Sequence, residues 1–217
     1  MTSPVVQSGV MPAEDSQVDQ DALIALAQCG DVAARERLFA LYRSYLVMLA
    51  RSQVQRRLQG KVDASDLAQD ALLEAHKGFA SFRGKTSPEL AAWLREILAH
   101  RLSRSVRHFF ETKRRDAKLE RSLAVELDNA SSMIERGLAA ADASPSQIAA
   151  QQETSLVLAD ALEALPDDYR QVILLRNFQG LPFADVAEAM GRSVDSVEKL
   201  WVRGLGKLRQ VVGERHG

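Results

Sequence analysis

Residues 62–115 carry the most restrictive pattern in the chain, because their charged and apolar side chains recur at helical spacing. On a wheel of 100° per residue, four carboxylates at steps of three, four and four residues share one narrow face. This acidic stripe consists of Asp63, Asp66, Asp70 and Glu74. The apolar residues form a second face made of Ala64, Ala68, Leu72, Ala75 and Phe79. The pattern predicts an amphipathic helix, and taken alone the stripe is typical of a solvated face.

The segment after this helix is rich in basic and aromatic residues. The loop at 79–88 contains two aromatic, two basic and three hydroxyl-bearing residues, and Pro88 suits the first turn of the helix that follows. That helix carries Trp93, Arg95, His100, Arg101, Arg104 and Arg107. Residues 76–118 hold 11 Lys/Arg and 4 Asp/Glu, a net charge of +7 in a chain whose total is -1. Such a segment is typical of proteins that bind single-stranded nucleic acid, although Trp93 would serve equally well in a core.

Net charge alternates in blocks along the whole chain. Residues 1–75 carry −3, residues 119–170 carry −7 and residues 171–217 carry +2, on either side of the +7 block. The near-neutral total therefore hides separate acidic and basic surfaces, which favours a protein with distinct DNA-facing and protein-facing sides.

The stretch reading DxxDLxQDxLLEAHKxFxxFRG, followed by WLREIL, resembles region 2 of bacterial RNA polymerase sigma factors. Within that family it is most similar to the small extracytoplasmic-function (ECF) group. The similarity runs over roughly fifty residues without a gap.

Helical spacing extends N-terminal to this stretch. We expect a helix over residues 20–28, a stop and new cap at Gly30 and Asp31, and a second helix from residue 32 to 50 or beyond. Residues 1–19 contain prolines, a glycine and many polar residues, and are predicted to be a disordered tail. The predicted N-terminal helical domain thus spans residues 20–115.

Residues 116–154 are predicted to be a long acidic linker. Ala, Ser, Asp and Glu dominate it, with expected breaks at 129–132 and 142–145 and short helices at 121–127 and 133–140. From the residues alone the linker is a solvated tether. The family resemblance implies more, because in sigma factors such a linker passes through the polymerase near the template and RNA.

The C-terminal segment, residues 155–212, has the layout of a helix-turn-helix domain. A helix over 183–190, a turn at 191–193 and a longer helix over 194–212 follow two shorter predicted helices. On the last helix an apolar arc lies opposite Ser196, Lys199, Arg203 and Lys207. The arrangement predicts one buried side and one side able to enter a major groove, and a plain four-helix packing unit is the alternative.

Residues 165–209 resemble sigma region 4, the module that reads the minus-35 promoter element. Order, spacing and the leading Leu-Pro agree with that region. Glu198 and Leu200 stand where many members have basic residues, and Gly204 and Gly206 interrupt the recognition helix at a cost of roughly 1 kcal/mol each. We therefore expect few phosphate contacts and an unusual or weak upstream element.

The sequence argues against an enzyme. The Gly84-Lys85-Thr86 triplet lacks the spacing and the preceding strand of a phosphate-binding P-loop, and no nucleophile-and-base set is present. One cysteine and four histidines without ligand spacing predict neither a metal site nor a cofactor. No membrane span or secretory signal is expected, and the single cysteine suits the reducing cytoplasm.

Two rival classes remain from the residues alone. A free-standing helix-turn-helix regulator that binds duplex DNA without polymerase would explain residues 165–212 equally well. It would not explain the order of acidic stripe, loop and basic helix. An adaptor that binds only proteins would leave the +7 block unused.

The resemblance predicts an all-α transcription initiation factor with two small helical domains joined by a long acidic linker. It implies that core RNA polymerase and promoter DNA are partners, that an anti-sigma factor is a further candidate, and that no small-molecule substrate is bound.

The acidic stripe and Gln69 would dock on the polymerase clamp, where family members bind a coiled coil. A second set would capture the melted minus-10 strand, with one base flipped into the loop: Phe82, Arg83, Lys85, Thr86, Trp93, His100, Arg101, Arg104 and Arg107. Ser196, Lys199, Arg203 and Lys207 would contact the minus-35 element.

Overall fold

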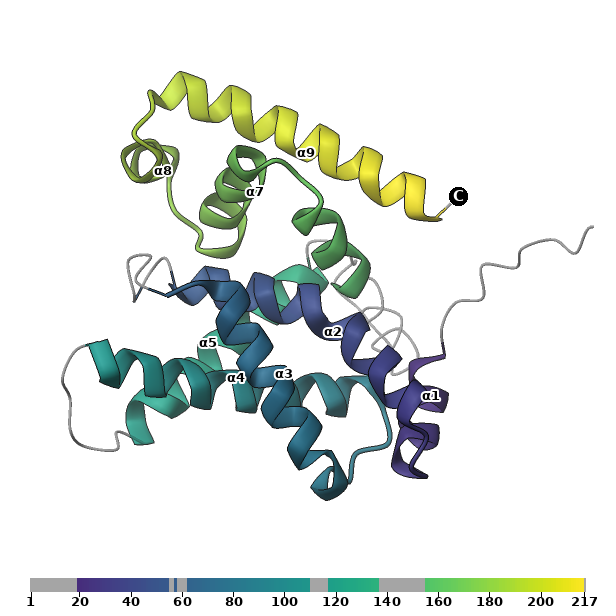
Figure 1. Cartoon of the computed structure of the whole chain (residues 1–217). Helices are drawn as coiled ribbons and strands as arrows, with labels where there is room; N and C mark the ends of the chain where they lie inside the picture. Colours follow the sequence, from purple (N-terminus) through teal and green to yellow (C-terminus); the bar gives the residue numbers. More distant parts are fainter. Residues whose placement is uncertain (1–18, 55–56, 58–61, 110–116, 137–154, 217) are drawn as a thin grey trace, which may run out of the picture.

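Two groups of helices make up the structure (Figure 1). The computed structural model describes residues 19–54, 57, 62–109, 117–136 and 155–216, and every regular element in those ranges is helical. Residues 1–18 of the tail predicted at 1–19, and residues 116 and 137–154 of the predicted linker, lie outside the described residues. The predicted all-α class is thus confirmed for the part of the chain that the structure describes.

The N-terminal group contains α1 (Gln20–Gln28), α2 (Val32–Gln53), α3 (Ala64–Gly78), a 3-10 turn (Phe79–Ser81), α4 (Ser87–Phe109) and α5 (Ala117–Arg136). Helix α1 has the predicted bounds. Aspartates begin the first three helices, because each accepts a hydrogen bond from a backbone N–H of the first turn. Asp19 accepts from Ala22 at 3.0 Å, and Asp31 accepts from Ala34 at 2.9 Å.

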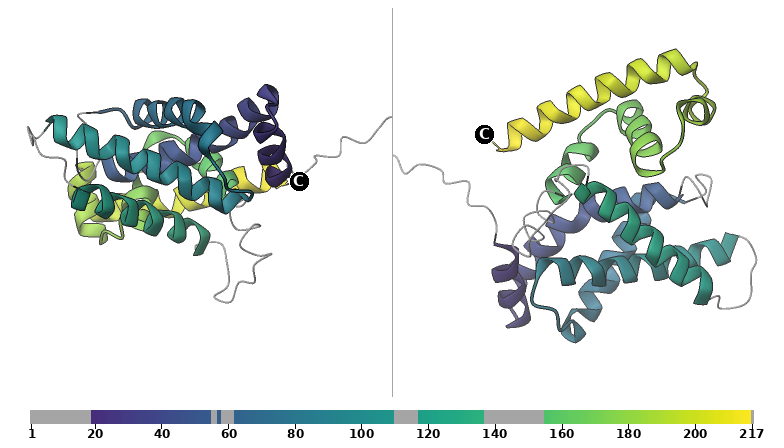
Figure 2. Two further views of the ribbon diagram at one scale, coloured as in Figure 1. Left: turned by 90° about the horizontal axis from the view of Figure 1, so that it is seen from below. Right: turned by 180° about the vertical axis from the view of Figure 1, so that it is seen from behind.

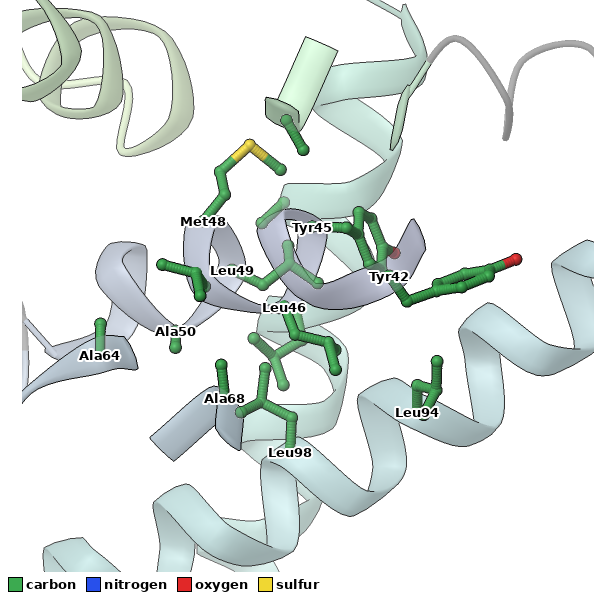
Figure 3. Packing of buried hydrophobic residues seen from close by; sticks show 14 of the residues in the cluster. Tyr42, Tyr45, Leu46, Met48, Leu49, Ala50, Ala64, Ala68, Leu94 and Leu98 are labelled. Atoms are coloured by element: carbon green, nitrogen blue, oxygen red, sulfur yellow. The ribbon is translucent and has the colours of Figure 1, made fainter. Parts of the chain in front are cut away.

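Helix α2 is the centre of the N-terminal group and contacts α1, α3, α4 and α5. Figure 3 shows Leu46 and Leu49 of α2 packed among small and branched residues of α3 and α4. Two tyrosines of α2 are fully buried, and each hydroxyl is hydrogen-bonded. The Tyr42 hydroxyl donates to Gln20 at 2.9 Å, and burial raises the pKa of Tyr42 above its ordinary value. These bonds tie α1 to α2 and hold the core in one arrangement.

Helix α5 occupies the first half of the predicted linker, where short helices at 121–127 and 133–140 and a break at 129–132 were expected. It is one helix of 20 residues that packs on α4 and buries Leu123, Leu127 and Ala130. Figure 2 shows this packing from behind. Ser131, inside a predicted break, is buried, and its hydroxyl lies 2.8 Å from that of Tyr45. Tertiary packing therefore overrides the turn preference of the local sequence.

The C-terminal group contains a helix over residues 155–163, α7 (Asp167–Ile173), a π-helical turn (Leu174–Phe178), α8 (Phe183–Met190) and α9 (Val194–His216). Gly191 ends α8 in the left-handed conformation, with φ of 61°, which glycine adopts without strain. The predicted turn at 191–193 and the helix-turn-helix layout are confirmed. Helix α7 starts at Asp167, and its N-cap is Pro166 without a side-chain cap.

The two groups touch along a seam that combines buried apolar residues with polar contacts. Arg51 of α2 forms an ion pair with Glu163 at 3.2 Å, and Gln179 donates to the Ser52 carbonyl at 3.3 Å. Beside the seam lies a groove of about 610 Å³ between α7 on one side and the end of α2 with residues 62–65 on the other. Its lining includes Asp63 and Arg170.

Among the described helices, none has the length and apolar character needed to cross a bilayer. Cys29, the single cysteine, is the C-cap of α1, and its side chain is exposed.

Candidate nucleic-acid and protein interfaces

The acidic stripe lies along one side of α3. Asp66, Gln69 and Asp70 are exposed, and Glu74 is partly exposed. Asp63 differs from its predicted place on the helix body, because it is the N-cap and accepts from the Ser65 N–H at 2.7 Å. The stripe therefore starts at the positive end of the helix dipole, where a carboxylate is stabilised.

Helix α4 neutralises the C-terminal end of the stripe. Arg101 of α4 approaches Glu74 at 2.6 Å and Asp70 at 3.9 Å. Asp66 and Gln69, one turn further toward the N-terminus, are therefore the part of the stripe with the greatest freedom to contact another protein.

The loop between α3 and α4 is folded around a buried aromatic cluster. Phe82 is 6% exposed, and its ring lies 5.8 Å from that of Phe79 and 5.0 Å from that of Trp93. A Cβ on Gly84 would stand 2.4 Å from the Phe82 ring, so the close approach of ring and backbone requires glycine there. Phe82 and the half-buried Trp93 support the loop from inside, and Phe82 offers no open face to a base in this arrangement.

Two side chains outside the predicted set hold the loop backbone. The Gln28 amide of α1 donates to the Gly84 carbonyl at 2.8 Å. Glu89 of α4 accepts from the N–H groups of Lys85 at 2.7 Å and Thr86 at 3.1 Å, and from the Thr86 hydroxyl at 3.0 Å. The Lys85 N–H and the two Thr86 groups lower the pKa of Glu89. The spacing Thr86-x-x-Glu89 is that of a capping box, which is the sequence signal that could have identified Glu89.

Arg83, Lys85 and Thr86 remain exposed on this braced loop. The Arg83 guanidinium donates to the Ala80 carbonyl at 2.8 Å, which keeps the side chain beside the preceding turn. Arg83 and Lys85 therefore present donors, and Thr86 an acceptor oxygen, on a backbone that is already fixed, so little conformational entropy is lost when a ligand binds.

The basic residues of α4 do not form one open cationic face. His100 lies 3.2 Å from Glu120 of α5, and Arg101 faces the carboxylates of α3. Arg107 donates to the Ser103 carbonyl of its own helix at 3.2 Å, whereas Arg104 is exposed. Of the four basic residues of α4 that were predicted to contact DNA, Arg104 has the most accessible charge.

The predicted contacts on α9 lie on the side away from its packed face. Val197 and Leu208 are buried, and the Trp201 indole donates to Asn177 at 2.8 Å. Lys199, Arg203 and Lys207 are exposed, Ser196 is half-buried, and Lys199 pairs with Asp195 at 2.7 Å.

The two glycines do not interrupt α9, which runs without a break from Val194 to His216. A Cβ on Gly204 would lie 3.4 Å from side-chain atoms of Ile173 and Tyr169, so this glycine lets α9 pack closely on α7. The helix predicted over residues 194–212 therefore continues through both glycines, despite their cost in helix stability.

The structure brings the stripe, the loop and the basic helix together in one module and leaves the α9 set in the other group of helices (Figure 1). Among the described residues, no cluster of three or more His, Cys, Asp or Glu side chains could hold a metal ion.

Comparison with known proteins matches each of these two modules to a family model. The family model of Sigma-70 region 2 matches residues 41–108, and that of Sigma-70, region 4 matches residues 155–208. The two matches together span more than half of the chain. The RNA polymerase sigma factor YlaC of Bacillus subtilis is 30% identical over 163 residues, covering 75% of this chain and 84% of that protein. The chain belongs to the sigma-70 family of RNA polymerase sigma factors.

The sigma factor is also similar to relatives of the ECF group. The ECF RNA polymerase sigma factor SigD of Mycobacterium tuberculosis (strain H37Rv) is 27% identical over 192 residues, covering 88% of this chain and 83% of that protein. A solved structure of CnrH in complex with the cytosolic domain of CnrY covers 90% of the sigma factor and 98% of that chain, at 23% identity and a TM-score of 0.33.

Membership of this family establishes the broad function. The protein is a transcription initiation factor that binds core RNA polymerase and directs it to promoters, and it is not an enzyme. The region 2 match removes the free-standing regulator as an alternative, because such a regulator has no use for that module.

Proposed function

We propose that the sigma factor divides promoter recognition and polymerase binding among three surfaces. The acidic stripe and Gln69 dock on the polymerase, the loop after α3 with α4 captures the minus-10 element, and α9 reads the minus-35 element. The observation that carries the proposal is the exposed stripe beside a braced, donor-rich loop in one module, with the helix-turn-helix in the other.

The docking surface centres on Asp66 and Gln69. Both side chains are exposed, whereas Glu74 and Asp70 face Arg101. Carboxylates on a rigid helix suit a basic partner surface, since complementary charge sets orientation and speeds encounter. Asp63 borders the interdomain groove and takes part once the partner covers the start of α3.

The minus-10 surface consists of the exposed loop residues Arg83, Lys85 and Thr86 together with Arg104. These groups bind the backbone of the melted strand and the edge of a flipped base, and the cost of unpairing that base is offset by the loop contacts. Phe82 and Trp93 stabilise the conformation of the loop by packing against each other on its buried side. His100, Arg101 and Arg107 add positive potential near the strand, although their side chains are engaged within the protein.

The minus-35 surface is the outer side of α9. Lys199, Arg203 and Lys207 supply cations for phosphate and base contacts, and Ser196 lies near the start of the helix. Because its partners are core polymerase and promoters, the protein would act in the cytoplasm. An anti-sigma factor stays a further predicted partner from the family resemblance.

The test is run-off transcription with purified core RNA polymerase, together with a direct measurement of core binding. Asp66→Arg/Asp70→Arg should weaken core binding at least about tenfold and abolish promoter-specific transcripts, because reversed charges repel a basic surface. Glu36→Arg/Glu96→Arg makes the same charge change at exposed carboxylates of α2 and α4 and should retain core binding. Circular dichroism checks that each variant is folded.

Unchanged core binding by Asp66→Arg/Asp70→Arg would contradict the proposed docking face. Equal losses in the two double variants would show that net charge matters and the face does not.

A further inference from the structure

Helix α9 presents an outward line of residues that is only partly basic. Asp195, Lys199, Val202 and Gly206 follow one another at steps of four, three and four, so they share the side opposite the buried Val197 and Leu208. All four are exposed. At the centre of the outer face, the apolar side chain of Val202 thus lies next to Gly206, which has no side chain.

Val202 is unusual in its exposure. At 62% it is the most exposed large hydrophobic residue in the part of the chain that the structure describes. Single exposed apolar residues are common on protein surfaces, but this one lies two turns into a recognition helix. Lys199 stands one turn before it and Arg203 directly beside it, so any nucleic acid drawn to these cations would meet Val202.

Gly206 lies one turn after Val202, and packing does not require a glycine there. A Cβ at this position would meet nothing within 4 Å, in contrast to Gly204, whose Cβ would touch α7. Glycine in a helix interior is less stable than alanine. A glycine that folding does not need, on an exposed helix face, suits close approach of a ligand to the helix backbone.

We propose that Val202 selects a thymine in the minus-35 element by contact with its C5-methyl group, and that Gly206 lets α9 lie close enough to make that contact. The inference rests on the proposed reading of the minus-35 element by α9. Thymine is the one base that presents a methyl group in the major groove, and apolar side chains recognise it there. Lys199 and Arg203 hold the phosphates on either side, which fixes the register of Val202 on the bases.

The experiment uses holoenzyme assembled from the full chain and core polymerase. Run-off transcription from a promoter library randomised at the minus-35 element first defines the preferred sequence. Each preferred thymine is then replaced singly by deoxyuridine, which removes only the methyl group. One such replacement should lower transcription by the wild type about fourfold, the change expected for losing one buried methyl-sized group.

The same replacement should leave transcription by Val202→Ala unchanged, because the contact is already gone. Val202→Ala should also lose the preference for thymine at that position in the library. Val32→Ala, which changes an equally apolar residue that is 54% exposed on α2, should behave as the wild type. Gly206→Ala should raise the melting temperature of the free protein and yet lower transcription, a combination that a purely structural role would not produce.

The outcomes separate this inference from the proposed function. A library in which the wild type prefers no minus-35 sequence would overturn both. A clear preference that Val202→Ala leaves intact, or that no deoxyuridine replacement affects, would overturn the role of Val202 while α9 keeps its place as the reading helix.

Discussion

Glu89 shows how one side chain can fix a functional loop. Its carboxylate accepts three hydrogen bonds from Lys85 and Thr86, at the junction between the loop and α4. These bonds hold the ionised form and lower the pKa of Glu89 from its ordinary value of 4.5. Since the folded pKa is lowered, the stabilisation is present above the ordinary value and is lost as the pH falls through the lowered one.

We therefore predict that the loop loosens at acid pH through Glu89. The amide resonances of Lys85 and Thr86 should titrate with a midpoint below the ordinary glutamate range in a nuclear magnetic resonance pH series. In Glu89→Gln this titration should be absent, and both amides should exchange faster with solvent at neutral pH, because a neutral acceptor binds N–H groups more weakly. A midpoint at or above 4.5 would contradict the prediction.

At the scale of the element, α5 joins the N-terminal group through its buried residues and its charges. Arg95 of α4 pairs with Asp128 at 2.6 Å and donates to the Tyr45 hydroxyl at 2.8 Å. Arg57 pairs with Glu126 at 2.5 Å. Part of the acidic charge that was predicted to lie in a linker thus forms ion pairs within the N-terminal group.

This packing predicts a clear difference between two neighbouring substitutions on α5. Leu127 is fully buried, so Leu127→Ala should lower the free energy of unfolding by about 2–5 kcal/mol. Val125 is 55% exposed on the same helix, and Val125→Ala should change it by no more than about 0.5 kcal/mol. Urea unfolding of the full chain measures both. Two silent substitutions would indicate that α5 is a tether after all.

Helical periodicity predicted the elements whose ends are marked by capping or turn residues in the sequence. Helix α1 begins after Asp19 and ends before Gly30, and the turn at Gly191 separates α8 from α9, so these bounds were recoverable from sequence. Helix α5 was not, because Asn129 to Ser132 favour turns locally and only the burial of Ser131 against Tyr45 reverses that preference.

The candidate site was predictable to a similar degree. Helical spacing placed Asp66 and Asp70 on one face, and both are exposed, whereas Gln69 was added by the family resemblance. The sequence pattern could not predict which side chains pair between different helices. The contacts of Arg101 with α3 and of His100 with α5 depend on how the helices cross. Buried Phe82 is a similar case, since a loop aromatic can face inward or outward with the same sequence.

At the scale of the whole molecule, the seam between the two groups limits what the protein can reach. The minus-10 and minus-35 elements are about 25 base pairs apart, roughly 85 Å at 3.4 Å per base pair. Helix α9, the longest C-terminal element with 23 residues, spans only about 35 Å. Because the two groups touch in the structure, we expect them to separate before both promoter elements are bound.

The polar part of the seam is partly open to water, so it is the part that salt can weaken. The side chains of Arg51 and Glu163 are 30% and 21% exposed, so water and salt weaken their ion pair. Arg51→Ala should cost about 1 kcal/mol or less of domain association and increase the radius of gyration in small-angle X-ray scattering at low salt.

Arg43→Ala removes an exposed arginine from the same helix and should leave the scattering curve unchanged. High salt should expand the wild type toward the Arg51→Ala curve. Identical curves for the wild type and Arg51→Ala at every salt concentration would contradict the role of this ion pair.

Cys29 gives the protein a ready attachment point for a spectroscopic reporter. Its thiol is the only one in the sequence and is exposed, so a maleimide fluorophore would label one position of the unaltered chain. The neighbouring Gln28 holds the loop through the Gly84 carbonyl. A dye there would stand next to the loop that is proposed to receive the flipped base, and promoter melting could be followed in real time without introducing a foreign residue.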